Sequence, residues 1–166
     1  QVVQLSTKVF SDSEGPSEGI LIGSLVVDLL NDTGHQDLFG FVATEEGKIV
    51  GAIFFTRLSF ATPVEAFILS PAAIRTDYQG MGIGQLLITF GCDQLKEKGV
   101  ELVFTYGDPH FYAKVGFEPI AEDMAKAPFA LSRPEGWLCK SLNKKGIQPL
   151  SGRSRCVNAL NKPEYW

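Results

Sequence analysis

The chain has 166 residues, of which 45% are hydrophobic and 20% are charged, and its formal net charge is −4. This length and composition are typical of one globular domain with a buried core. The net negative charge argues against the basic surface that nucleic-acid binding normally requires, so we expect no nucleic-acid partner.

The first predicted element is a mostly apolar helix over Ile20–Leu30, which ends in the breaker cluster Asn31–Gly34. The preceding segment Ser11–Gly19 reads as a turn-rich loop or a capped helix start. The apolar stretch Gly19–Leu30 is too short to span a bilayer, carries Asp28 and follows acidic residues. These features argue against a transmembrane helix and a signal peptide, so we expect no membrane partner.

Three strand candidates follow. Leu38–Thr44 and Lys48–Leu58 are rich in β-branched and aromatic residues, and the polar turn Glu45–Gly47 between them predicts a β-hairpin. Val64–Ile74 is also strand-like, but it contains Pro71. Because proline cannot donate to a sheet ladder, we expect this strand to be locally broken or to lie at an edge.

A helix is predicted over Ile83–Lys98, since its apolar positions recur at helical spacing and Gly99 ends it. The strand Val100–Tyr106 follows directly. A strand, a helix and a strand in this order predict a βαβ unit whose two strands are parallel neighbours. Pro109–Val115 is expected to form one or two helical turns.

Two further strands are predicted at Phe117–Ile120 and Trp137–Leu142, which complete a domain over residues 1–142. The remaining residues 143–166 are polar, basic and glycine-containing. We expect them to form a surface extension packed on or beside the same domain, with Tyr165 and Trp166 docked on its body. A subunit contact or part of a substrate wall is the alternative.

The three cysteines, Cys92, Cys139 and Cys156, are odd in number and have neither a CxxC motif nor metal-ligand spacing. We therefore expect buried free thiols in a reducing compartment, a cytoplasmic protein and no metal site. Cys92 lies among apolar residues of the predicted helix, which does not favour a nucleophilic role.

The segment DYQGMGIGQLL places Gly80, Gly82 and Gly84 just before the predicted helix. Backbone N–H groups in the first turn of a helix lack intrahelical partners, and the helix dipole adds positive charge there. Glycines let a phosphate reach these donors, so the pattern favours an anion cradle. The spacing fits neither the Rossmann nor the Walker fingerprint, because Gln85 stands where each would need another residue. A purely structural glycine turn is the alternative.

Residues 72–84, AAIRTDYQGMGIG, followed by QLL, resemble the acetyl-CoA-binding motif of the GNAT N-acetyltransferase superfamily. Gln79, Gly82 and Gly84 fit its anchor positions. Further along, FYAKVGF at residues 111–117 resembles the family segment Leu/Phe-Tyr-x-Lys-x-Gly-Phe. The two motifs occur in the family's order, and the resemblance covers roughly residues 38–142.

The resemblance implies an α/β fold with a mixed, mostly antiparallel sheet, helices on both faces and a splayed pair of parallel strands. Pro71 fits a gap where those strands part. The implied function is transfer of an acetyl group from acetyl-CoA, used as a co-substrate, to a primary amine of a small molecule or peptide. The amine would attack directly in a ternary complex, and a homodimer is common among relatives.

The resemblance also implies which residues hold the cofactor. Main-chain groups at the end of the proline-containing strand would contact the pantetheine arm, and backbone N–H groups of the glycine loop would hold the pyrophosphate. Met81 stands where relatives often carry Lys or Arg, so one phosphate contact is missing. The implied cofactor-binding residues are Ala73, Ile74, Arg75, Gln79, Gly80, Met81, Gly82, Ile83, Gly84 and Gln85.

Tyr112 is the implied general acid, because a phenol with a reference pKa of about 10 can share a proton with a departing thiolate. Packing beside Phe111 and Phe117 is the structural alternative. Glu65 is the candidate base for the amine, against the alternative of an ordinary solvated carboxylate.

Asp108 and His110 flank Tyr112 and are candidates for lining the acceptor pocket, although Asp108 before Pro109 is also an ordinary helix N-cap. The Gly-Asp-Pro sequence at 107–109 replaces the family's usual Asn and resembles a subgroup whose substrates are unassigned. Two rivals stand beside the enzyme: a non-catalytic acyl-CoA-binding or sensor domain, and an enzyme for a longer acyl-CoA.

Overall fold

The computed structural model describes all of residues 1–166, and it begins with two helices, α1 (Val2–Glu14) and α2 (Pro16–Asp32). The sequence did not predict α1, and α2 starts before the predicted Ile20. Gly15, with a φ of 101°, makes the corner between the helices, and Pro16 opens α2 at a position that needs no N–H donor. The segment expected as a turn-rich loop or a capped helix start is therefore a helix–helix corner.

Small residues let these two helices pack closely. A Cβ on Gly19 would collide with Ser11, and a Cβ on Gly23 would collide with Thr7, both on α1. The apolar residues of α2 face the sheet, so the pair covers one face of it.

One mixed sheet of six strands forms the centre of the molecule, in the order β1-β2-β3-β4-β6-β5. All neighbours are antiparallel except β3 and β4, which are parallel. This arrangement confirms the predicted mixed, mostly antiparallel sheet. The strands are β1 (Leu38–Glu45), β2 (Lys48–Arg57), β3 (Ala66–Ile74), β4 (Leu102–Tyr106), β5 (Glu118–Pro119) and β6 (Trp137–Ser141).

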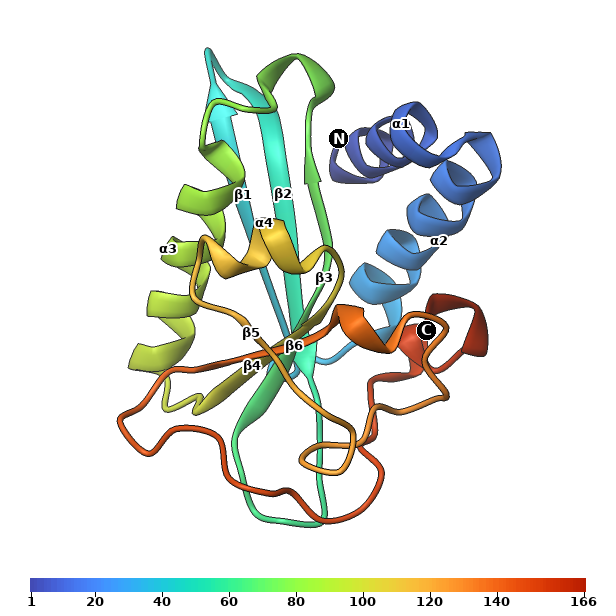
Figure 1. The fold of residues 1–166 in the computed structure, drawn as a ribbon. Coiled ribbons are helices and arrows are strands. Elements are labelled where there is room, and N and C mark those ends of the chain that lie inside the picture. Colours follow the sequence, from blue (N-terminus) through green and yellow to red (C-terminus); the bar gives the residue numbers. More distant parts are fainter.

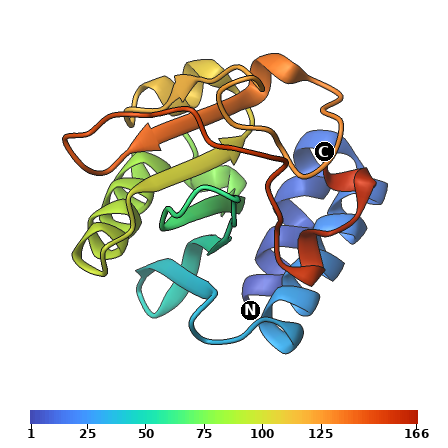
Figure 2. The same cartoon turned by 90° about the horizontal axis from the view of Figure 1, so that it is seen from below.

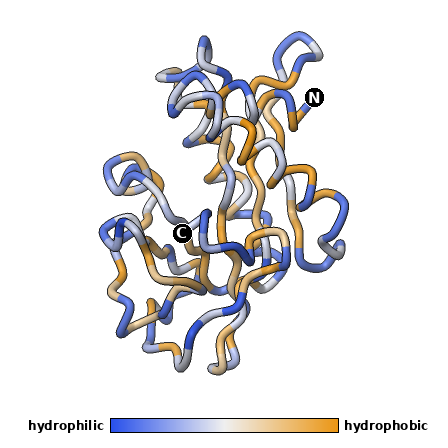
Figure 3. Tube along the Cα trace, turned by 90° about the vertical axis from the view of Figure 1, so that its right-hand side faces the viewer, coloured by the Kyte–Doolittle hydropathy of each residue, from blue (hydrophilic) through white to orange (hydrophobic).

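The helices α3 (Ile83–Glu97) and α4 (Pro109–Ala113) lie on the face opposite α1 and α2, as Figures 1 and 2 show. Alternating strand residues therefore enter two separate cores. Phe54 and Ile68 pack under α1 and α2, whereas Ile53 and Phe67 pack under α3. Figure 3 shows the hydrophobic segments running along the central strands, with hydrophilic segments at the turns.

The predicted hairpin is present, with Glu46 and Gly47 both at positive φ in the turn between β1 and β2. The predicted break in β3 is also present. The register between β2 and β3 shifts at Ser70 and Pro71, so that Phe55 faces Leu69 while the pairing resumes further along the strand.

The parallel strands β3 and β4 pair only between Ala66 and Leu69 on β3. Beyond Leu69, β3 continues beside β2 alone, and β4 continues beside β6. At the point where they part, the buried Thr105 hydroxyl donates a 3.0 Å hydrogen bond to the Leu69 carbonyl. The expected splay is thus part of the fold.

The last residues, 143–166, run back over the domain and end beside α2, where Figure 2 shows them in red. Their backbone bonds to other loops, for example through reciprocal bonds between Ser59 and Arg155. Trp166 is only 6% exposed and donates its Nε1–H to the Leu160 carbonyl at 3.0 Å. Four short 3-10 helices complete the fold: Thr76–Tyr78, Pro134–Gly136, Asn158–Leu160 and Pro163–Tyr165. No helix combines the length and the apolar character needed to cross a membrane.

Candidate active site

A glycine loop joins β3 to the N-terminus of α3. Gly80 and Gly82 have φ values of 76° and 81°, which L-residues rarely adopt, and Gly82 is the N-cap of α3. A Cβ on either glycine would meet no atom within 4 Å, so the loop is open to a ligand on that side. Gly84 has another reason to be glycine, because its Cβ would lie 3.3 Å from the Phe111 ring and 3.4 Å from Ile74.

Six successive N–H groups in this loop donate to no other backbone group, and the first bond of α3 runs from the Leu86 N–H to the Gly82 carbonyl at 3.0 Å. The helix dipole adds partial positive charge at the same place. A row of free donors at a helix N-terminus is the arrangement that binds phosphate groups. The donors belong to Gly80, Met81, Gly82, Ile83, Gly84 and Gln85.

Side chains hold the loop in this shape. The Gln79 amide donates to the Ile74 carbonyl at 3.0 Å, which ties the loop to the end of β3. Arg75 makes two 2.6 Å hydrogen bonds to Asp77 and stacks on the Tyr78 ring at 4.4 Å. Met81 is 66% exposed.

The free edge of β3 presents main-chain groups to the gap between the parallel strands. The Arg75 N–H bonds to the Val50 carbonyl on β2, so alternation turns the groups of Ala73 toward β2 as well. The N–H groups of Ala72 and Ile74 point the other way, where β4 has diverged. The main chain of Ala73 therefore pairs within the sheet, and its two neighbours offer donors to the gap.

Tyr112 lies on α4 beside the point where the strands part. Its ring packs against Phe111 and Phe117, with centroids 5.1 and 5.5 Å away, and lies over Gly107, where a Cβ would come within 2.8 Å of it. Burial raises the pKa of the phenol above its usual value, and the neighbouring Thr105 hydroxyl acts in the opposite direction. The phenol therefore stays protonated at neutral pH and can serve as a proton donor.

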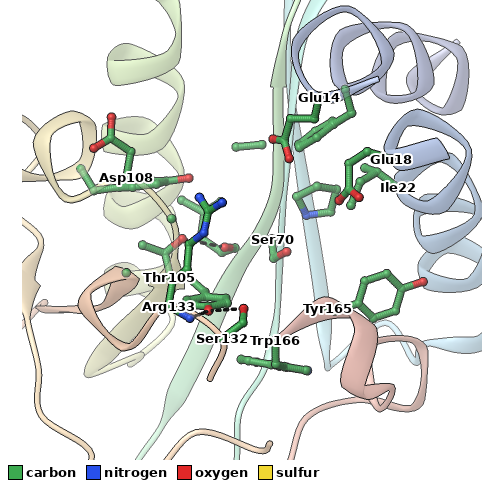
Figure 4. A pocket seen from close by; sticks show the side chains of 18 of the residues that line it. Glu14, Glu18, Ile22, Ser70, Thr105, Asp108, Ser132, Arg133, Tyr165 and Trp166 are labelled. Carbon is green, nitrogen blue, oxygen red and sulfur yellow. Dashed lines mark hydrogen bonds between the residues drawn. The ribbon is translucent and has the colours of Figure 1, made fainter. Parts of the chain in front are cut away.

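A cavity of about 760 Å³ opens from the strand gap, and Tyr112 lies in its wall. Leu69, Ser70, Pro71, Ala72 and Thr105 form the end at the gap. The opposite wall comes from the corner between α1 and α2, and the floor comes from the end of the chain, as Figure 4 shows. The charged residues in the lining are Glu14, Glu18, Asp108, Arg133, Glu135 and Glu164.

Two of the predicted site residues lie outside the cavity lining. Glu65 precedes β3 at the far end of the strand, five residues or about 17 Å from Ser70, and it pairs with Arg57 at 2.7 Å. It does not line the cavity, so the structure does not place Glu65 where a base for the amine would act. His110 is exposed and also lies outside the cavity lining. Asp108 lines the cavity, and it caps α4 by accepting the His110 N–H at 3.0 Å.

The sequence reasoning missed the acidic wall. Glu14 and Glu18 lie on either side of the unpredicted corner at Gly15, and burial, followed by repulsion from Glu14, raises the pKa of Glu18. No local motif marks these residues, since only the packing of α1 brings them to the cavity. Tyr165 and Trp166 also line it, as the substrate-wall alternative for the end of the chain required.

The cysteines take no part in this site. Cys92 and Cys139 are buried, and Cys156 is partly buried. Desolvation raises the pKa of Cys92 to about 11, which disfavours the thiolate that a nucleophile needs. No group of three or more His, Cys, Asp or Glu side chains gathers in a way that would hold a metal ion.

A splayed parallel pair, a donor-rich loop at a helix start and a cavity beyond them define an acyltransferase of the acetyltransferase class. The family model described as an acetyltransferase (GNAT) domain matches residues 36–119. The chain is 36% identical over 140 residues to the uncharacterized N-acetyltransferase YjhQ of Escherichia coli K12, covering 81% of this chain and 77% of that protein. It is also 36% identical to the N-acetyltransferase YhbS of the same organism over 96 residues, or 57% and 56% of the two chains.

The chain belongs to the GNAT acetyltransferase family. Its fold is similar to that of E. coli YhbS, crystallised with CoA, with a TM-score of 0.80 and 24% identity over 96% of this chain and 87% of that one. It is similar to a Brucella melitensis GNAT acetyltransferase, crystallised with acetyl-CoA, with a TM-score of 0.70 and 21% identity over 96% and 89% of the two chains.

Proposed function

We propose that this protein transfers an acetyl group from acetyl-CoA to a primary amine by direct attack in a ternary complex. The observation that carries the proposal is the row of six free N–H groups from Gly80 to Gln85. This row follows β3, the strand that borders the gap. Related proteins crystallised with CoA or acetyl-CoA support the same choice of co-substrate.

In the proposed complex the loop donors hold the pyrophosphate of CoA, and the pantetheine arm lies along the free edge of β3. The N–H groups of Ala72 and Ile74 suit that arm or the thioester oxygen, because β4 no longer pairs with β3 there. The thioester then enters the gap near Ser70, at the mouth of the cavity.

In the reaction, the neutral amine attacks the thioester carbonyl carbon, and negative charge develops on the carbonyl oxygen. A main-chain N–H of the β3 edge stabilises that charge. When the carbon–sulfur bond breaks, the electron pair goes to sulfur, and the nitrogen loses a proton to solvent. Holding both reactants in one site supplies much of the rate without a covalent intermediate.

Tyr112 is the proposed proton donor to the departing sulfur, and its phenolate then regains a proton from solvent. Burial raises the pKa of its phenol, so the acid form persists as the pH rises and is lost only above the ordinary value of about 10. Turnover that depends on this acid should therefore hold at neutral pH and decline only in strongly alkaline solution.

Calorimetric titration with acetyl-CoA, followed by a free-thiol release assay with a panel of amines, tests the proposal. We expect saturable binding and thiol release that depends on the amine. Failure to bind acetyl-CoA at millimolar concentration would reject the function. Binding without amine-dependent release would support the sensor alternative instead.

Tyr112→Phe tests the chemistry separately. The variant should lower kcat by at least about tenfold, because the leaving thiolate loses its acid, while the affinity for acetyl-CoA changes little. Tyr78→Phe is the matched control, since this tyrosine lies beside the glycine loop and outside the cavity lining. Unaltered kcat in Tyr112→Phe would remove Tyr112 from the mechanism.

A further inference from the structure

The cavity beyond the strand gap is strongly acidic. Five carboxylates line it and only one basic side chain, Arg133, balances them. Four segments of the chain supply these acids: the corner between α1 and α2, the loop after β4, the loop before β6, and the end of the chain. Such a wall attracts cations and repels anions.

Two of the carboxylates are free to bind a ligand. Neither Glu14 nor Glu18 makes an ion pair or a side-chain hydrogen bond within the chain. They lie within one helical corner, whose shape is fixed by Gly15 and by the close packing at Gly19. Figure 4 shows both side chains directed into the cavity from the wall opposite Thr105.

The end of the chain completes the same part of the cavity. Trp166 forms its floor and stacks with Tyr106, with ring centroids 6.3 Å apart. Tyr165 stands on the same side of the cavity as Glu18 in Figure 4, and burial, partly opposed by Lys162, raises the pKa of its phenol. Aromatic faces beside carboxylates are a favourable environment for an ammonium or guanidinium group.

The acidic corner lies across the cavity from the reacting end. The attacking nitrogen must be neutral and close to Tyr112, whereas a carboxylate pair holds its partner nitrogen in the charged form. Glu14 and Glu18 therefore suit a cationic group of the acceptor that does not react. A cavity of about 760 Å³ has room for an acceptor with two separated nitrogens.

We propose that the acceptor of this enzyme carries a second cationic group, which Glu14 and Glu18 bind while Tyr165 and Trp166 flank it. This inference rests on the proposed acetyltransferase function and narrows its substrate to diamines, polyamines and related multiply charged amines. Simple monoamines lack a second cationic group, and the second group of an ω-amino acid is a negatively charged carboxylate, which Glu14 and Glu18 would repel.

The test compares three series of acceptors of matched chain length: short α,ω-diamines, n-alkyl monoamines and ω-amino acids. Titration of each into the CoA-saturated protein measures binding without turnover, and thiol release with acetyl-CoA measures kcat/KM. The best diamine should bind at least about tenfold more tightly than its monoamine, since hydrogen bonds to charged groups are worth that much or more. The amino acids should bind most weakly.

The variants Glu14→Gln and Glu18→Gln test whether the corner between α1 and α2 causes the preference for diamines. Each variant should reduce the preference for the diamine over the monoamine several-fold, and the two substitutions together should remove it. Glu46→Gln, in the hairpin turn between β1 and β2, is the matched control and should leave this preference unchanged.

Equal binding of diamines and monoamines at every chain length would overturn the inference and leave the proposed function intact. An equal loss for both acceptor types in the corner variants would also overturn it. Failure of the protein to bind acetyl-CoA is a different result, because it rejects the function itself while the titration of amines into the free protein still tests the cation site.

Discussion

The two ends of the site are built in different ways. The cofactor end uses backbone groups of one continuous stretch, from β3 through the glycine loop into α3. The acceptor end uses side chains from the first helices, the middle loops and the last residues of the chain. A short sequence motif therefore defines the cofactor end, whereas the residues of the acceptor end come together only when the chain folds.

Because of this difference, the acceptor specificity can change by substitution while the cofactor binding stays the same. Backbone donors at a helix start depend on glycine geometry rather than on side-chain chemistry, so they serve any member of a family that uses the same cofactor. The acidic wall depends on individual side chains, and a few substitutions there would change the acceptor without touching the cofactor. Substitutions at the two ends should thus affect different measured quantities.

The largest expected effect is at the cofactor end. Gly82→Val should weaken acetyl-CoA binding by about 100-fold, because it strains a left-handed position and blocks two or more charge-assisted hydrogen bonds. Calorimetric titration measures the change. Gly47→Val is the matched control, since Gly47 also has a positive φ with open space around it but lies in the distant hairpin. Comparable binding by both variants would contradict the anion cradle.

A smaller effect is expected between the two ends, at the support of Tyr112. Gly107→Ala should lower kcat by about tenfold, because the added methyl group would lie 2.8 Å from the Tyr112 ring and displace the phenol. The affinity for acetyl-CoA should change little. Gly34→Ala, which has open space around it, controls for a general effect of the substitution. A full kcat in Gly107→Ala would mean that the position of the phenol is unimportant.

The smallest effect is expected outside both ends. Glu65→Gln should leave kcat unchanged and lower the free energy of unfolding by at most about 1 kcal/mol, because its ion pair with Arg57 is partly exposed. Asp37→Asn, which removes the other partner of Arg57, should behave in the same way. Steady-state kinetics and denaturant unfolding measure the two quantities. A tenfold loss of kcat in Glu65→Gln alone would restore Glu65 as a base.

The contrast also explains how far the sequence could be interpreted. Periodicity and turn residues predicted the hairpin at Glu46 and the βαβ unit, since these depend on neighbours along the chain. The break at Pro71 followed from its missing N–H. Helix α1 escaped prediction because Gln1 before it makes no capping hydrogen bond and because polar residues outnumber apolar ones along it.

The site was predicted to the same extent and for the same reason. The glycine loop and Tyr112 could be proposed from local motifs, and Tyr112 lies in the wall of the cavity. The structure places Glu65 away from the cavity, because distance along a strand cannot be seen in a list of residue types. Glu14, Glu18 and Arg133 became candidates only when the packing of α1 and the loop before β6 placed them around one cavity.

The hydrogen bond from Thr105 to the Leu69 carbonyl also bears on how the two parallel strands are held apart. Where two strands separate, a backbone carbonyl oxygen is normally left without a hydrogen-bond donor. Such an oxygen favours either continued strand pairing or the entry of water. The Thr105 hydroxyl donates to that carbonyl oxygen, and the pairing between β3 and β4 ends at this residue pair. The separation of β3 and β4 is therefore built into the fold. Ligand binding then includes no free-energy cost for separating the two strands.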